Sequence, residues 1–321
     1  MKEKKRVLLI GSGRRMQSVV VPALWCLRDF FEIVSTYSRR GNSIPFFDNS
    51  FTTSATSDLT TLDFKKIDII ILAVTLTEVP NVLKELVRYE VGHATLLLDT
   101  PVLRPEHLFA QKLFKRFGEV RVSEDTIALP PLLLAKKVIA EEGLGAIKNM
   151  YFFHNGYKYH ALAGLKTLAA GSIRSVRSRS FPGGLMRKDI VFSAGTRAIM
   201  TEPHTYDVGR FLVECERGSI ADYSVPGGRL IGYELAQGTY RNLTLDGVSL
   251  PESELDRRYK EIISEDLYEK STIHGLKIRA MMDLLRSAAD HTPDFAYAPK
   301  SALSDWFAIA LCEKLGWTIV L

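Results

Sequence analysis

The sequence has little cysteine, no long hydrophobic run and no strong excess of either charge. Its three cysteines, Cys26, Cys215 and Cys312, are odd in number, lie far apart and sit in apolar or helical settings. This pattern predicts core residues rather than a disulfide framework or a zinc cluster. No apolar run approaches the roughly 20 residues that cross a bilayer. The start, MKEKKRVLLIGSG, has neither the apolar region nor the cleavage site of a signal peptide. We therefore expect a cytoplasmic protein without a membrane segment.

The charge balance and the composition limit the classes of partner and fold. Lys plus Arg is 42 and Asp plus Glu is 37, so the net charge is +5. This surplus is too small over 321 residues to indicate nucleic-acid binding. The sequence also shows no helix-turn-helix, aromatic platform or basic stripe. A content of 46% hydrophobic and 25% charged residues predicts a globular chain with one large core or, more in keeping with its length, two.

Residues 1–124 alternate short apolar runs with longer amphipathic ones. The expected strands are 6–10, 32–37, 67–75, 94–99 and 119–123, and the expected helices are 17–29, 80–89 and 106–117. Continuous apolar strands separated by helices predict a parallel sheet that is covered on both faces. The first domain is therefore expected to be α/β, with the doubly wound parallel sheet of the Rossmann arrangement.

The pattern changes after Glu124. The expected helices are 132–142, 157–170, 199–215, 270–289 and 299–315, with strands at 147–154, 172–181 and within 220–250, a glycine-rich loop at 181–195, and a strand-like end, TIVL. This order is typical of an α+β domain with an open-faced, mostly antiparallel sheet. We expect it to cover residues 125–321, with the helix 299–315 packing back on the first domain.

A glycine turn follows the first strand directly and opens the first helix. Gly11 and Gly13, on either side of Ser12, permit a tight turn and close approach of a diphosphate. The helix start adds free N–H groups and a partial positive charge. Met16 stands at the third position of G-x-G-x-x-G, where a small residue normally lets helix and strand pack closely. The turn either binds a dinucleotide, which its place in the chain favours, or is a plain strand-to-helix turn.

The end of the second strand indicates which dinucleotide is bound. An NAD-binding domain would place an acidic residue here to bond the ribose 2′-hydroxyl, whereas this chain has Ser38, Arg39 and Arg40 after Tyr37. A hydroxyl and two guanidiniums suit a 2′-phosphate, so we predict NADP rather than NAD. The alternative is a solvated basic loop. The expected cofactor-binding residues are Gly11, Ser12, Gly13, Arg14, Arg15, Met16, Ser38, Arg39, Arg40, Ala73, Val74, Thr75, Asp99, Thr100 and Pro101.

Several short motifs follow one another along the chain in an order that is typical of a known family. They are Asp99-Thr100-Pro101, Val122-Ser123-Glu124, Gly143-Leu144-Gly145-Ala146-Ile147, Ser193-Ala194-Gly195 and Glu202-Pro203-His204-Thr205-Tyr206-Asp207. In this order the chain resembles, over nearly its whole length, the glucose–fructose oxidoreductase / inositol dehydrogenase (Gfo/Idh/MocA) family. The resemblance implies a Rossmann domain followed by an open-faced sheet domain and a nicotinamide cofactor. It also implies a homo-oligomer, a dimer or tetramer, assembled through the open sheet face.

Two residues depart from the family pattern. Thr100 stands where the family carries a lysine that polarises a substrate hydroxyl or carbonyl, and Met200 replaces an Asp that usually precedes the family's His by four residues. A lysine can hold a hydroxyl near its alkoxide form and a threonine cannot, so a sugar-alcohol dehydrogenase mechanism is not favoured. Either the protein is a reductase whose substrate needs no lysine, such as an imine or a conjugated double bond, or catalysis has been lost.

His204 and Asp207 are expected on the helix 199–215, three residues apart and therefore on one face. The resemblance implies that this face lines the substrate pocket, where His204 supplies a proton and Asp207 orients it. The alternative is a capping or core histidine beside a surface aspartate. A metal site is not expected, because hydride transfer needs none and no compact third ligand is evident.

Residues 154–160, HNGYKYH, are dense in titratable groups where the second domain's first strand should end. Tyr157, Lys158 and His160 are candidates to replace the missing lysine, with Thr100 at the lysine's own position. They either line the site or cover the rim of the sheet. Further candidates are Lys188 and Asp189 in the glycine-rich loop, while Arg174, Arg177 and Arg179 form a solvated strand surface or accept an anionic substrate.

These features predict an NADP-dependent oxidoreductase. The simplest form is a reductase that transfers hydride from NADPH to a small C=N, C=O or conjugated C=C substrate. The alternative is a non-catalytic dinucleotide-binding or scaffold protein derived from the same family. The expected partners are a small-molecule substrate and further copies of the chain, with no nucleic acid and no membrane.

Overall fold

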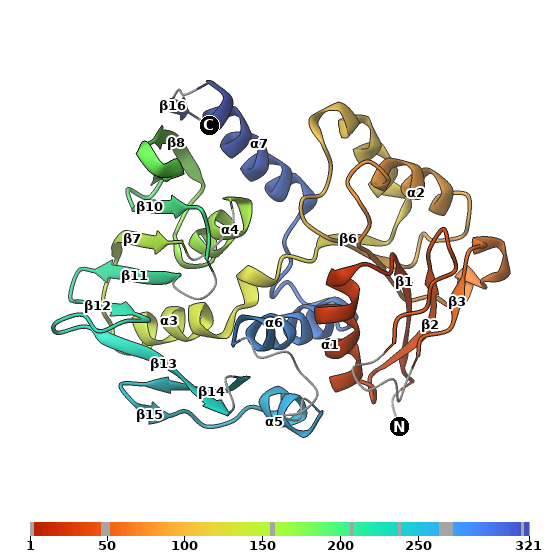
Figure 1. Cartoon of the computed structure of the whole chain (residues 1–321), viewed down its shortest axis with the longest axis horizontal. Helices are drawn as coiled ribbons and strands as arrows, with labels where there is room; N and C mark the ends of the chain where they lie inside the picture. The colour runs from red at the N-terminus through yellow and green to blue at the C-terminus, as the bar shows by residue number, and fades with distance from the viewer. Residues whose placement is uncertain are drawn as a thin grey trace. The chain divides into compact units, whose positions relative to one another are not determined.

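The computed structural model describes residues 3–45, 52–154, 158–205, 209–236, 239–262, 272–315 and 318–320. The chain divides into two compact units (Figure 1): Met1–Asp125 with Ser253–Leu303, and Thr126–Glu252 with Ser304–Leu321. Among the helices of these described stretches, none is long and apolar enough to cross a membrane.

The first unit is built on a six-stranded parallel sheet. Its strands are β1 (Lys5–Ile10), β2 (Phe31–Tyr37), β3 (Ala55–Thr56), β4 (Ile69–Leu72), β5 (Thr95–Leu98) and β6 (Glu119–Val122). They lie in the order β3-β2-β1-β4-β5-β6, and every neighbouring pair is parallel. The strand order reverses between β1 and β4, and ligands of such sheets bind outside the carboxyl ends of the strands at this point. The predicted doubly wound sheet is confirmed.

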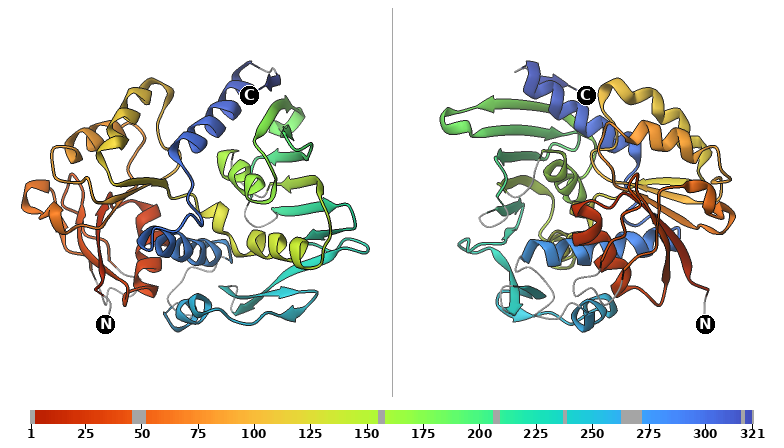
Figure 2. Two further views of the ribbon diagram at one scale, coloured as in Figure 1. Left: turned by 180° about the vertical axis from the view of Figure 1, so that it is seen from behind. Right: turned by 45° about the vertical axis from the view of Figure 1, so that its right-hand side comes forward.

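Helices from two distant parts of the chain complete the first unit. The first of the early ones is a π-helix (Met16–Val20), which continues into α1 (Val21–Cys26). The others are α2 (Val79–Leu86) and the 3₁₀ helices Leu59–Thr61, Phe64–Lys66 and Pro105–Arg116. The late ones are α5 (Glu254–Ile262) and α6 (Thr272–Ala289), which pack on α1 (Figure 2). The sequence did not predict α5, because this helix buries only Tyr259 and the rest of its residues are mostly polar.

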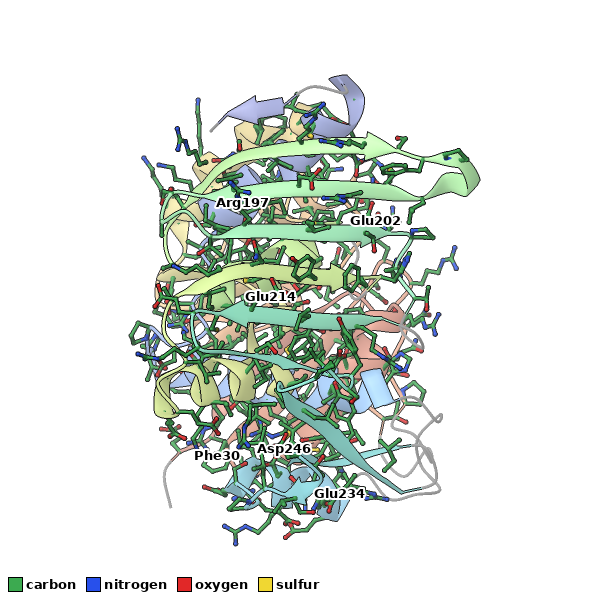
Figure 3. The ribbon with its side chains drawn as sticks, turned by 90° about the vertical axis from the view of Figure 1, so that its left-hand side faces the viewer. Phe30, Arg197, Glu202, Glu214, Glu234 and Asp246 are labelled. Carbon is green, nitrogen blue, oxygen red and sulfur yellow. The ribbon has the colours of Figure 1, made fainter. Side chains whose placement is uncertain are left out.

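The second unit is built on a ten-stranded sheet, seen face-on in Figure 3. Its strands are β7 (Ile147–Phe153), β8 (Ile173–Ser180), β9 (Met186–Phe192), β10 (Arg197–Glu202), β11 (Arg210–Cys215), β12 (Gly218–Ala221), β13 (Arg229–Ala236), β14 (Thr239–Leu245), β15 (Val248–Ser249) and β16 (Thr318–Val320). Only the pairs β7–β10 and β12–β13 are parallel among those described. The predicted mostly antiparallel α+β unit is therefore confirmed.

Side chains alternate between the two faces of this sheet. Phe152, Met200 and Phe211 are buried on the face that packs on α3 (Pro130–Glu141) and α4 (Lys158–Leu168). Tyr151 and Leu212, paired across β7 and β11, are half-exposed on the opposite face. The last helix, α7 (Pro299–Leu315), passes from the first unit to the second at Ser304. Its predicted packing on the first domain stays a prediction.

Two elements of the second unit differ from the sequence prediction. The helix expected at 199–215 is wrong, because β10 and β11 occupy most of that range. Buried residues alternate with more exposed ones in both strands, which is the period of a strand rather than of a helix. The loop expected at 181–195 is also wrong in part, because β9 lies within it and only a short turn at Pro182–Gly184 remains between β8 and β9.

Asp222, directly after β12, is a partly buried carboxylate. It accepts a hydrogen bond from the Phe211 N–H at 2.7 Å. Burial raises the pKa of Asp222 to about 6, although this hydrogen bond and the charge of Arg210 act in the opposite direction. The folded chain therefore holds this proton more tightly than the unfolded chain does. The free energy of unfolding falls for this reason as the pH rises from about 4 to about 6.

Asp222→Asn is expected to raise the free energy of unfolding by about 1–2 kcal/mol at pH 7.5, because the amide still accepts the hydrogen bond and carries no charge. Urea unfolding at pH 7.5 and at pH 4 measures this effect, and the gain should disappear at the lower pH. A variant with unchanged stability at pH 7.5 would contradict the raised pKa.

Candidate functional site

A pocket of about 500 Å³ lies at the carboxyl ends of β1, β2, β4 and β5. It gathers many of the residues predicted to bind a cofactor: Gly11, Ser12, Gly13, Arg14, Arg15, Ser38, Arg39, Ala73, Val74, Thr75 and Asp99. Met16, Arg40, Thr100 and Pro101 are not among its lining residues. Strand ends that are far apart in sequence thus meet at the point where the strand order reverses.

The glycine turn has a geometry that only glycine adopts without strain. Gly11 has a φ of +106°, and a Cβ added to it would lie 2.1 Å from the carbonyl oxygen of Ala73. The Gly11 N–H donates to the Tyr37 oxygen at 2.9 Å, which fixes the turn against the end of β2. At Gly13 an added Cβ would meet nothing within 4 Å. The backbone is therefore open to a ligand at Gly13.

The first backbone N–H groups of a helix have no partner within the helix. The Gln17 N–H donates to the Gly13 oxygen at 3.2 Å, and the Gln17 amide side chain donates to the Ser12 oxygen at 2.8 Å. Met16 is fully buried and belongs to the core of the unit. The helix start can therefore present N–H groups to an anion, while Met16 takes the packing position that a small residue usually holds.

Arg15 links three strand ends at one side of the pocket. Its guanidinium donates to Asp125 at 2.5 Å and to the Ser123 oxygen at 3.3 Å, and its Nε lies 3.3 Å from a carboxylate oxygen of Asp99. Burial alone would lower the pKa of Arg15, but the charges of Asp125 and Asp99 outweigh burial and raise it. Arg15 is thus a cation that is held by carboxylates and positions Asp99, and its predicted part in cofactor binding stays a prediction.

Of the two arginines in the turn after β2, only Arg39 lines the pocket. The Gly41 N–H donates to the Ser38 oxygen at 2.9 Å, and the Ser38 hydroxyl accepts from the Asn42 N–H at 2.7 Å. Arg39 lines the pocket and lies 3.4 Å from the Glu78 carboxylate. Arg40 is exposed outside it. The hydroxyl of Ser38 already holds the turn together, so Arg39 is the residue of this segment with a charge directed to the pocket.

One face of α2 forms a wall of the pocket that the sequence prediction missed. Glu78, Asn81, Val82 and Glu85 all line it. Their spacing of three, four and seven residues places them on one helix face, which is the signal that could have identified them. Burial, followed by the charge of Glu85, raises the pKa of Tyr37 on the neighbouring strand. The pocket is therefore lined by hydrogen-bond acceptors of the α2 wall as well as by arginine side chains.

The segment after β10 carries His204 and lies against the end of β7. The Thr205 N–H donates to the His154 oxygen at 3.0 Å, and the His154 Nδ1 bonds to the Pro203 oxygen. His204 is half-buried in this non-helical segment. Its predicted place on a helix is therefore wrong. Asp207 lies outside the described residues, so a shared role of His204 and Asp207 stays a prediction.

The helix α4 begins beside this segment. The Lys158 N–H donates to Glu202 at 2.7 Å, while the Lys158 ammonium donates to Glu313 at 2.7 Å. His160 is half-buried on the first turn of α4, and Tyr157 lies outside the described residues. The start of α4 and the segment after β10 thus meet at one end of the sheet, but the ammonium of Lys158 is held by a carboxylate.

Lys188, expected in a loop, is instead the fully buried centre of a charge cluster. Its ammonium lies 2.7 Å from Glu202 on β10 and 2.8 Å from Glu313 on α7. Burial favours the neutral form of Glu313, but the hydrogen bonds and charges of Lys158 and Lys188 outweigh it and lower the pKa of this carboxyl. The cluster anchors β9, β10, α4 and the second-unit part of α7 to one another.

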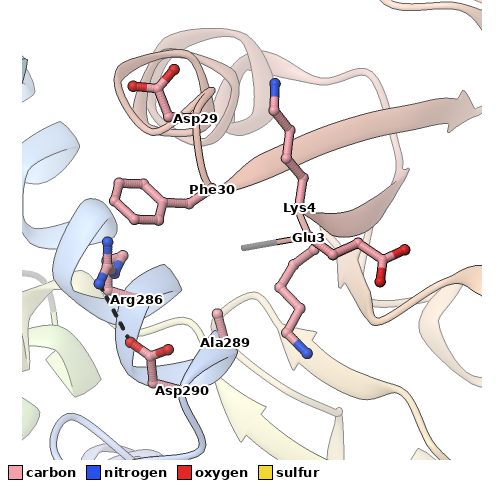
Figure 4. Close-up of a pocket in the computed structure, with 8 residues that line it drawn as sticks. Glu3, Lys4, Asp29, Phe30, Arg286, Ala289 and Asp290 are labelled. Carbon is pink, nitrogen blue, oxygen red and sulfur yellow. Dashed lines mark ion pairs between the residues drawn. The ribbon is translucent and has the colours of Figure 1, made fainter. Parts of the chain in front are cut away.

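A second cavity, of about 470 Å³, lies at the other end of β1 (Figure 4). Its lining residues are Glu3, Lys4, Lys5, Asp29, Phe30, Arg286, Ala289 and Asp290. The Arg286 guanidinium lies 3.9 Å from the centre of the Phe30 ring and 3.5 Å from the Asp290 carboxylate. Lys5 pairs with Asp68 at 3.5 Å. Two of its cations, Arg286 and Lys5, are thus already held by carboxylates.

The sequence matches no family model, and no curated protein matches it. Solved structures share the fold along the whole chain. A myo-inositol dehydrogenase from Corynebacterium glutamicum has a TM-score of 0.67 at 12% identity and 99% coverage of both chains. The WlbA dehydrogenase from Bordetella pertussis, in complex with NADH and UDP-GlcNAcA, has a TM-score of 0.66 at 16% identity, covering 100% of this chain and 98% of that one.

A third similar structure is not described as an enzyme. The super-repressor mutant of Gal80p from Saccharomyces cerevisiae has a TM-score of 0.67 at 13% identity, covering 99% of this chain and 98% of that one. At these identities the likeness establishes the fold. It confirms at that level the resemblance seen in the sequence motifs.

Proposed function

We propose that the protein is an NADP(H)-dependent oxidoreductase, most simply a reductase of a small C=N, C=O or conjugated C=C substrate. The observation that carries the proposal is the convergence of the glycine turn, Arg39 and the ends of β4 and β5 on one pocket at the switch point of the sheet. Dehydrogenases with the same fold, one of them in complex with NADH, support the coarser part of the proposal, an oxidoreductase with a nicotinamide coenzyme.

The residues of the pocket fit a dinucleotide in two places. The open backbone at Gly13 and the amides of the helix start suit the diphosphate. Arg39 suits a 2′-phosphate through a charge-assisted hydrogen bond. Asp99, held by Arg15, lies where β5 ends, next to Thr100. A bound reduced nicotinamide supplies hydride, which is the chemistry that the chain's own side chains lack.

The protein's remaining task is to orient a substrate and supply a proton. Among the candidates, His204 and His160 carry imidazole rings, and an imidazole can hold a proton at a ring nitrogen for transfer to the reduced substrate. Thr100, Lys158, Tyr157 and Asp207 stay predictions for the same site. The ammonium of Lys158 would have to leave Glu313 to act on a substrate.

Arg39→Asp tests the cofactor proposal. Loss of the guanidinium and gain of a carboxylate are expected to weaken NADPH binding about 100-fold, since a charge-assisted hydrogen bond is replaced by repulsion. Binding of NADH, which has no 2′-phosphate, should change less than about threefold. Fluorescence titration of the two coenzymes measures both constants.

Arg40→Asp is the matched control, because this neighbour in the same turn lies outside the pocket. It should leave the preference between the coenzymes unchanged within about threefold. The cofactor assignment fails if Arg39→Asp preserves the parent's preference, or if both variants alter it equally.

A second candidate function is dinucleotide binding without turnover. By the family resemblance Thr100 stands where a lysine is expected, and the ammonium of Lys158 is held by Glu313. A repressor variant shares the fold. Absorbance at 340 nm with a panel of imines, ketones and enones distinguishes the two functions. Oxidation of NADPH favours the reductase, and tight binding without turnover favours the second candidate. In both cases we propose a homo-oligomer formed through the open sheet face.

A further inference from the structure

Arg39 and Glu78 form an ion pair at the rim of the cofactor pocket. Their charged atoms lie 3.4 Å apart, and both residues line the pocket. Arg39 comes from the turn after β2, whereas Glu78 directly precedes α2, so the pair joins this turn to the start of α2 across the rim. The side chain of Arg39 is 75% exposed and that of Glu78 is 29% exposed. The guanidinium can therefore move, while the carboxylate is the more enclosed partner.

This pair gives the two coenzymes different requirements. A 2′-phosphate carries between one and two negative charges near neutral pH, and Arg39 can bind it fully only by turning away from Glu78. The carboxylate of Glu78 also repels a phosphate that enters the same pocket. A ribose 2′-hydroxyl is neutral, so NADH neither breaks the pair nor meets this repulsion.

We propose that Glu78 is a specificity-determining residue that limits the preference of this pocket for NADPH by holding Arg39. The proposal rests on the proposed function, because it assigns a role to a residue of the same cofactor pocket. Binding of the 2′-phosphate replaces the Arg39–Glu78 pair by an Arg39–phosphate pair and leaves the Glu78 carboxylate without its guanidinium partner. NADH binds with the ion pair intact.

A double-mutant cycle tests this role. The full-length parent, Glu78→Gln, Arg39→Gln and the double variant are each titrated with NADPH and with NADH, and the ratio of the two dissociation constants is compared. Glu78→Gln is expected to shift the ratio about fivefold toward NADPH, the size of a strong exposed ion pair. In the Arg39→Gln background the same substitution should shift it less than about twofold, because no guanidinium is left to release and only the screened repulsion between Glu78 and the phosphate is relieved.

The control is Glu90→Gln. Glu90 forms an ion pair with Lys65 at the same 3.4 Å, but it is 71% exposed and lies outside the pocket. Its substitution should leave the ratio unchanged. Circular dichroism and thermal unfolding of each variant verify that it is folded.

Three results separate the possible failures. An unchanged ratio in Glu78→Gln, or a shift toward NADH, overturns the role of Glu78. A shift that persists at full size without Arg39 also overturns it, because the ion pair is then not the route. If the folded parent binds neither coenzyme, the proposed function itself fails, which is a different outcome from binding with an unaltered ratio.

Discussion

Replacing Gly11 with alanine is expected to lower the free energy of unfolding by about 3–5 kcal/mol and to abolish detectable coenzyme binding. The added Cβ would lie 2.1 Å from the carbonyl oxygen of Ala73, and the φ of +106° is strained for any L side chain. Because the obstacle is backbone at the end of β4, it cannot move without distorting the sheet. Urea unfolding and calorimetric titration with NADPH measure the two effects.

Gly13→Ala is the matched control for this substitution. Its Cβ would meet nothing within 4 Å, so stability should change by less than about 0.5 kcal/mol. Coenzyme binding should nevertheless weaken about tenfold or more, because the methyl group stands where the diphosphate is expected to approach the backbone. A Gly11→Ala protein with parental stability and binding would contradict the geometry of the turn. Parental binding by Gly13→Ala would contradict the placement of the diphosphate.

Lys188→Met is expected to lower the free energy of unfolding by about 3–5 kcal/mol. The lysine is fully buried and neutralises Glu202 and Glu313, so its removal leaves two carboxylates beside a long apolar side chain. The loss should be larger at pH 7.5 than at pH 5, because without Lys188 burial favours the neutral form of the two carboxylates, and their protonation at the lower pH removes the uncompensated charges. Denaturant unfolding at the two pH values measures it.

Lys148→Met provides the comparison for burial. Lys148 lies 2.7 Å from Glu216, the same distance as between Lys188 and Glu202, but its side chain is 57% exposed. Its loss should lower stability by less than about 1 kcal/mol. Adding Glu202→Gln and Glu313→Gln to Lys188→Met should recover part of the stability, because the uncompensated charges are then removed. Equal effects of the two lysine substitutions would contradict the account of the cluster.

The first unit was predictable because its strands are buried on both faces. Runs such as Val7–Leu8–Leu9–Ile10 are continuously apolar and fully buried, and they alternate with helices in the order of a parallel sheet. Nothing comparable marks Ser253–Leu303 as part of this unit. The mostly polar face of α5 gives no sign of the distant partner on which the helix packs.

The second unit was harder to predict, because its strands are covered on one face only. In β10 and β11 the buried positions alternate with half-exposed ones that include Ile199 and Leu212, so the apolar residues appear nearly continuous and resemble a helix. In β9 the buried position between Arg187 and Asp189 is a lysine, which suggests a loop unless Glu202 and Glu313 are known to neutralise it.

The candidate site divides in the same way. The glycine turn and Arg39 follow strands directly, so their meeting at one sheet edge can be predicted from sequence order. The acidic wall of α2 depends on which face of this helix turns to the pocket. The fixing of Arg15 by Asp125 depends on a contact between residues that are 110 positions apart in the sequence. Such long-range contacts cannot be predicted from the local sequence.

Whether the pocket of the first unit holds a nicotinamide coenzyme is decided by calorimetric titration of the folded, full-length protein with NADPH and NADH. Saturable binding of both coenzymes at one site per chain is expected, with the lower dissociation constant for NADPH. The absence of heat and of saturation with either coenzyme, on material whose circular dichroism shows it to be folded, would contradict it.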